Sequence, residues 1–245
     1  QNKLIDKIMV MPNYTFYCHE QVSVELLRHN TVGPLEWFKG KVKSKLIYLY
    51  NDEMILDELT AIYGDLALVM YVDMLKTACD AYKDGYFEEN FTEMSKINAL
   101  YVGRTEFLEK LTLDCETIGA GKNLGELKSY VLLQALNMKF GQRVYVFCSD
   151  DKNARNGIVA MGGANCISVL FSFVRLQKEI HFSREDAEPY IKSYMSCCLG
   201  KNQTTFRIQD TSKEKRMCKV PCEQVFDEIF AGKIDEMRTG NLKYI

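Results

Sequence analysis

The sequence has little proline, little histidine, no long hydrophobic run and no excess of one charge. Only 4 of its 245 residues are proline, which argues against long disordered linkers. No run of about 18 apolar residues occurs, so we expect no transmembrane helix and no membrane partner. The net charge is -2, so a nucleic-acid partner would have to be held by a local basic patch.

Cysteine, in contrast, is abundant. There are 9 cysteines, an odd number, and some lie inside apolar runs, such as Cys148 and Cys166. This pattern favours reduced, buried thiols in a cytoplasmic protein over a disulfide framework. Cys197 and Cys198 are adjacent, which is awkward for a tetrahedral zinc site, and no CxxC pair is present.

The spacing of apolar residues predicts alternating helices and strands, and hence an α/β fold with a parallel sheet. We expect strands over 14–21, 143–149 and 165–169. We expect helices over 2–11, 23–30, 52–82, 87–113, 126–141 and 151–163, with breaks at Gly64 and Gly103. The tail from 177 onward looks mostly helical, with a polar stretch at 201–217.

Lysines alternate with other residues in one segment, at Lys39, Lys41, Lys43 and Lys45. A period of two predicts an extended segment with one basic face. Such a face could contact an RNA backbone. The favoured reading is an edge strand that uses lysine to discourage association with other strands.

Acidic residues stand where strands end or helices begin. Asp150 and Asp151 close a strand, Glu126 opens a helix, and Glu25 lies in the helix after the first strand. In an open parallel sheet these positions gather at one edge, where carboxylate oxygens suit Mg²⁺ or Mn²⁺. Each acid also has a simpler explanation. Glu126 has capping-box spacing from Asn123, the aspartates could cap a turn, and Glu25 could be solvated.

Two segments resemble the PIN domain, the fold of metal-dependent ribonucleases. One is LGELKSYVLLQALNMKFGQRVYVFCSDDKNAR, with a Gly-Glu pair that opens a helix and a Ser-Asp-Asp-Lys-x-Ala-Arg turn after a strand. The other, YTFYCHEQVSVELLRH, is similar to the second strand and the following helix of the family. The resemblance implies that Glu25, Glu126 and Asp151 hold the metal beside Asp150, and that Ser149 braces the site. Arg155 would contact a phosphate or pair with Asp151.

The resemblance implies a three-layer fold around a central parallel sheet. Residues 1–50 and 111–177 would form the PIN-like domain, 51–110 a helical insertion and 178–245 a mainly helical extension. The family's first strand, which ends in an aspartate, would then lie upstream of Gln1.

The function implied is that of an Mg²⁺- or Mn²⁺-dependent endoribonuclease acting on RNA. One alternative is a degenerate PIN-like module that binds RNA or protein without cleavage. Another is an unrelated α/β domain whose acids only cap helices. An antitoxin-like protein or a second copy of the chain would be the protein partner.

Overall fold

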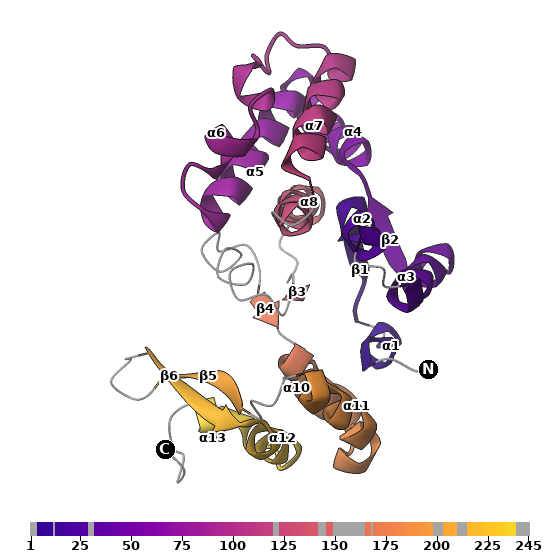
Figure 1. Cartoon of the computed structure of the whole chain (residues 1–245). Coiled ribbons are helices and arrows are strands. Elements are labelled where there is room, and N and C mark those ends of the chain that lie inside the picture. Colours follow the sequence, from indigo (N-terminus) through magenta and orange to yellow (C-terminus); the bar gives the residue numbers. More distant parts are fainter. Residues whose placement is uncertain are drawn as a thin grey trace. The chain divides into compact units, whose positions relative to one another are not determined.

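The structure is a computed structural model of the chain (Figure 1). It describes residues 4–11, 13–28, 32–119, 123–141, 146–148, 165–167, 169–197, 203–209 and 215–238. The chain forms two compact units. The central unit is Thr15–Ile167, and the terminal unit combines Gln1–Tyr14 with Ser168–Ile245. The protein is mixed α/β and mostly helical, and its expected first piece, 1–50, is divided between the two units.

The strands of the central unit form two short parallel pairs. Strand β1 (Phe16–His19) pairs with β2 (Ile47–Tyr50), and β3 (Val146–Cys148) pairs with β4 (Asn165–Ile167). The expected parallel pairing is confirmed for these strands. Among the described residues, however, the pairs are separate sheets of two strands, so one central sheet with three full layers is not confirmed.

The helices of the central unit are α2 (Glu20–Arg28), α3 (Val32–Lys43), α4 (Asp52–Tyr63), α5 (Ala67–Tyr82), α6 (Tyr86–Asn90), α7 (Arg104–Ile118) and α8 (Leu124–Phe140), with 3-10 turns η1 (Gly64–Leu66) and η2 (Met94–Lys96). Most lie close to predicted helices, but α3 forms where an extended segment was expected and α7 ends five residues later than expected. The helix expected over 151–163 lies outside the described residues. Gly64, with φ 57°, ends α4, which confirms the predicted break because few other residues adopt this conformation. Gly103 is the N-cap of α7.

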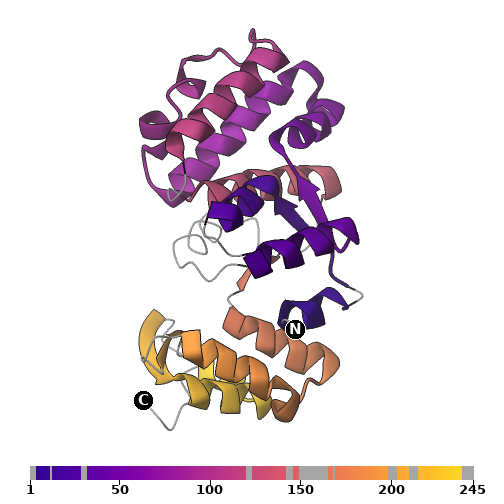
Figure 2. The same ribbon diagram turned by 45° about the vertical axis from the view of Figure 1, so that its right-hand side comes forward.

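Helix α8 lies between the helical part of the central unit and its strands (Figures 1 and 2). The core contains fully buried side chains from α4, α5, α7 and α8, including Leu56, Leu75, Phe107 and Tyr130. Burying one such side chain contributes about 1.5–3 kcal/mol. The expected insertion, 51–110, therefore shares one hydrophobic core with α8.

The lysine segment is not a strand. Lys39, Lys41 and Lys43 lie in α3, and Lys45 follows it with a positive φ of 58°. A helix places Lys39 and Lys43 on one side and Lys41 on another, so the single basic face is wrong. Lys39 pairs with Glu36, and Lys41 lies over the Trp37 ring.

The terminal unit packs four helices against one another. They are α1 (Leu4–Met9), α10 (Val169–Ile180), α11 (Arg184–Cys197) and α12 (Cys222–Phe230), followed by the short α13 (Ile234–Arg238). The Phe226 ring lies 5.0 Å from that of Phe173 and 5.7 Å from that of Tyr194. These contacts join α10, α11 and α12.

The tail is less helical than predicted. Strand β5 (Gln203–Gln209) pairs antiparallel with β6 (Lys215–Pro221), within and just after the stretch expected to be a polar linker. No helix in the described parts of the chain is long and apolar enough to cross a membrane.

Candidate functional site

The structure brings two of the predicted acidic segments together. The carboxylate of Glu25, on α2, accepts a hydrogen bond of 2.8 Å from the backbone N–H of Gly125, in the first turn of α8. Glu126 is the next residue on that helix. Two segments that lie 100 residues apart in the sequence therefore meet at the predicted site.

Glu25, and not Asn123, caps the start of α8. Asn123 is the N-cap residue, with φ 56°, but its side chain makes no capping hydrogen bond and donates to the Tyr82 hydroxyl. The alternative explanation of Glu126 as part of a capping box therefore lacks the hydrogen bond from the Asn123 side chain. A Cβ atom on Gly125 would lie 2.6 Å from Glu25 Oε2, so only glycine allows this close approach.

Strand β3 ends near the same part of α8. The ring of Phe147, the middle residue of β3, lies 5.4 Å from that of Tyr130 in an edge-to-face contact. Tyr130 is about one helical turn after Glu126. The predicted site residues that follow β3 lie outside the described residues: Ser149, Asp150, Asp151 and Arg155.

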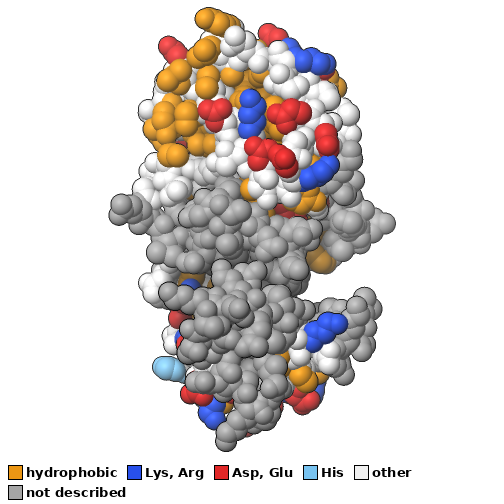
Figure 3. Space-filling model, turned by 90° about the vertical axis from the view of Figure 1, so that its left-hand side faces the viewer, with side chains coloured by type: hydrophobic (Ala, Val, Ile, Leu, Met, Phe, Trp, Pro, Cys, Tyr) orange, Lys and Arg blue, Asp and Glu red, His pale blue; other side chains and the backbone are white. Residues whose placement is uncertain are grey.

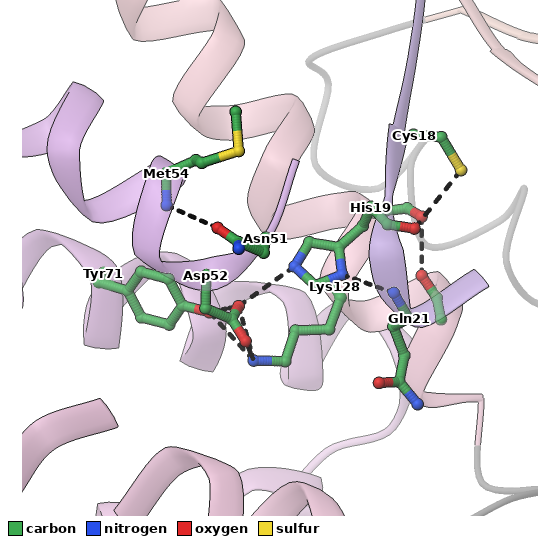
Figure 4. A network of polar contacts seen from close by, with 10 residues as sticks. Cys18, His19, Gln21, Asn51, Asp52, Met54, Tyr71 and Lys128 are labelled. Carbon is green, nitrogen blue, oxygen red and sulfur yellow. Dashed lines mark hydrogen bonds and ion pairs between the residues drawn. The ribbon is translucent and has the colours of Figure 1, made fainter. Parts of the chain in front are cut away.

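A buried polar network that the sequence did not predict joins the ends of β1 and β2 to α8 (Figure 4). Asp52, which follows β2 at the start of α4, accepts two 2.9 Å hydrogen bonds from Lys128 Nζ. His19, at the end of β1, lies with Nε2 3.2 Å from Asp52 Oδ1. The Tyr71 hydroxyl donates to Asp52 and accepts a 3.0 Å bond from Lys128.

The protonation states in this network follow from its geometry. The backbone N–H of Gln21 donates to Nδ1 of His19, so the ring proton lies on Nε2 and is donated to Asp52. Burial alone would raise the pKa of Asp52, but Lys128, His19 and Tyr71 hold it well below its usual range. Burial opposes the charge on Lys128, yet Asp52 raises its pKa well above the ordinary value. Lys128 and Asp52 are thus a buried ion pair.

Another carboxylate lies beside this network. Glu20 is the first residue of α2, directly after His19. Although the residue is exposed, desolvation of its carboxyl raises the pKa of Glu20, and the charge of Asp52 acts in the same direction. Glu20 and Glu25 therefore lie on α2, and Glu126 lies on α8, which Glu25 contacts through Gly125.

The described carboxylates are of the type that binds a hard cation, but too few of them lie together to hold one. Glu25 and Glu126 offer the oxygen ligands that Mg²⁺ and Mn²⁺ prefer. Within the described ranges, however, no group of three or more His, Cys, Asp or Glu side chains is placed to hold a metal. A complete site therefore needs the acids that follow β3.

Most of the thiols that the structure describes are sheltered, as expected, whereas the side chain of Cys166 lies outside the described residues. Cys79 and Cys222 are buried, and Cys18 and Cys115 are partly buried. Cys148 is exposed, so its predicted burial is wrong. It is the last residue of β3, where the strand leaves the core.

No family model, no curated protein and no solved structure matches this chain.

Proposed function

We propose that the central unit is a PIN-like endoribonuclease that depends on Mg²⁺ or Mn²⁺ and hydrolyses RNA phosphodiester bonds. The observation that carries this proposal is the hydrogen bond between Glu25 and Gly125, which joins the two upstream acidic segments. A metal site at the edge of the sheet would require Glu25 and Glu126 to lie close together, and this contact brings their segments together.

In this proposal, Glu25, Glu126 and Asp151 hold the metal, Asp150 lies beside them, and Ser149 and Arg155 support the site. Asp150 and Asp151 follow Phe147 by three and four residues, a reach of about 10–13 Å in an extended chain. Glu126 lies only about 6 Å along the helix from Tyr130, which Phe147 contacts. The chain is therefore long enough to bring these aspartates to Glu126. A bound divalent ion would lower the pKa of a water molecule and stabilise charge on the phosphate.

Cleavage of a labelled single-stranded RNA in the presence of Mn²⁺ tests this function. We expect Glu126→Gln and Asp151→Asn each to reduce cleavage by about 100-fold or more, because each removes a charged ligand. Glu88→Gln, an exposed change on α6, serves as the control. Cleavage that persists in both site variants, or that persists in excess chelator, would refute the proposal.

One observation favours a second function, in which the unit binds RNA or a protein without cleavage. Glu25 already caps α8, so one of its oxygens is engaged in a structural role. A degenerate PIN-like module of this kind would retain the Glu25–Gly125 contact for stability alone. RNA affinity without cleavage, unchanged by Asp151→Asn, would favour this alternative. An antitoxin-like protein or a second copy of the chain would then be the partner to test.

A further inference from the structure

Helix α7 presents two different faces. Phe107, Leu111 and Ile118 are buried and bind the helix to the core. Leu113, in contrast, is 51% exposed, although it is a large apolar residue. Figure 3 shows that apolar side chains gather on one side of the helical part of the central unit. On α7 itself, the exposed Leu113 lies among carboxylates, which are considered next.

A shallow groove of about 630 Å³ follows this outer face. We call it the α7 groove. Its lining comprises Glu53 of α4 and, on α7, Thr105, Leu108, Glu109, Thr112, Leu113 and Glu116. Threonine methyl groups and leucine side chains therefore alternate with carboxylates along the helix.

The negative charge of the groove is compensated only in part. Three glutamates line it, and no lysine or arginine is among the described residues that do. Arg104 lies 3.9 Å from Glu53 and 2.6 Å from Asp57, so Glu53 has a cation beside it, whereas Lys110 pairs with Glu106, outside the lining, at 3.1 Å. Among the described contacts, neither Glu109 nor Glu116 has an ion pair or a side-chain hydrogen bond.

The spacing along α7 indicates what shape of partner fits. Glu109 and Glu116 are seven residues apart, about 10.5 Å along the helix axis, with Thr112 and Leu113 between them. A second helix repeats its own side chains at the same interval, so lysines or arginines spaced by seven would meet both carboxylates. Apolar residues between those cations would cover Leu113. RNA does not fit, because phosphates would face three carboxylates.

We propose that the α7 groove docks a basic amphipathic helix of a partner protein. The charges of the groove and helix are complementary, and the apolar centre supplies contact area that excludes water. This interface does not depend on the ribonuclease function, and it lies on other elements than the Glu25–Gly125 contact. Nuclease activity and docking can therefore fail separately.

A designed 21-residue Leu/Lys helix with a fluorescent label, measured by anisotropy with the full chain, provides the probe. We expect saturable binding to the unaltered chain. The double variant Glu109→Gln with Glu116→Gln should bind the peptide about ten-fold more weakly, and its affinity should depend less on salt concentration. Asp80→Asn with Glu88→Gln removes two exposed charges outside the groove in the same unit, and we expect less than about a two-fold effect. Leu113→Asn should also weaken binding.

Equal losses in the groove and control variants would show that the peptide responds only to net charge and would overturn the proposal. Absence of saturable binding to the unaltered chain would also overturn it. Circular dichroism of each variant separates lost docking from lost folding, and the Leu113 change, on an exposed side chain, supplies a second test that keeps all charges.

Discussion

The backbone N–H of Gly125 donates a hydrogen bond of 2.8 Å to Oε1 of Glu25, so a carboxylate from α2 caps the start of α8. This contact gives Glu25 a structural role whether or not it also holds a metal. It also fixes the position of Glu126, the neighbour of Gly125, relative to α2. Glu25 therefore contributes both to the stability of α8 and, in the proposed function, to metal binding.

Gly125→Ala tests this contact, because the added methyl group would lie 2.6 Å from Glu25 Oε2 and displace the carboxylate. The flexible Glu25 side chain can move aside, and alanine itself favours the helix, so the lost cap should cancel that gain or outweigh it by up to about 1 kcal/mol in the free energy of unfolding, measured with urea. Mn²⁺ binding should also weaken. Gly40→Ala is the matched control. Its methyl group meets nothing within 4 Å in α3, so the change should stabilise the helix by about 0.5–1 kcal/mol. Equal stability of the two variants would contradict the capping role.

Lys128→Met tests the buried network. Lys128 is 1% exposed and is the ion-pair partner of Asp52, whose side chain is 21% exposed, so its loss leaves a partly buried charge without its cation. We expect destabilisation of about 2–3 kcal/mol, less than for a fully buried pair because water reaches Asp52 and His19 and Tyr71 still bond it. Adding Asp52→Asn should partly recover this loss. Lys83→Met removes an exposed pair with Glu89 and should cost less than about 1 kcal/mol. Additive effects of the Lys128 and Asp52 changes would show that the two residues are not coupled.

The same network predicts the response to acid. The pKa of Asp52 is lowered in the folded protein, so its stabilising effect is complete above the unfolded value of 3.8 and is lost as pH falls below it. The free energy of unfolding, measured with urea, should differ less between pH 6 and pH 3 for Asp52→Asn than for the unaltered chain. The same pH dependence in both proteins would show that Asp52 does not cause the loss of stability in acid.

Thiol reactivity provides a separate test of burial. Burial raises the pKa of the Cys79 thiol to about 12, so little thiolate forms and access is closed, whereas Cys148 is exposed. Alkylation by iodoacetamide at pH 8, mapped by mass spectrometry, should modify Cys148 at least about ten times faster than Cys79. Similar rates at the two positions would mean that the core around α5 opens readily.

Local signals in the sequence predicted most helices and the strands β1, β3 and β4. Gly64 ends α4 because of its positive φ, and the apolar run after Gly125 gives α8. Local signals failed for the lysine segment, because alternating charges over so few residues fit a helix as well as a strand. They also failed for β5 and β6, although the paired residues are only 6 to 18 positions apart, because the polar composition of this segment concealed the strands.

The buried network could have been suspected from α8 alone. Lys128 follows Leu127 and stands two residues before an apolar run, and the apolar residues of the helix are not confined to one face, which is typical of a buried helix. A lysine in such a helix requires an acidic partner. The sequence does not reveal which of 33 acidic residues supplies it, because Asp52 reaches Lys128 only through the packing of α4 on α8.

Mn²⁺ titration by calorimetry tests the central claim most directly, with the full chain compared with Asp151→Asn combined with Glu126→Gln. Our account predicts saturable binding to the unaltered chain and its loss in the double variant, while Asp80→Asn with Glu88→Gln binds normally. No binding to the unaltered chain, or binding that the double variant retains, would contradict a metal site formed by these carboxylates.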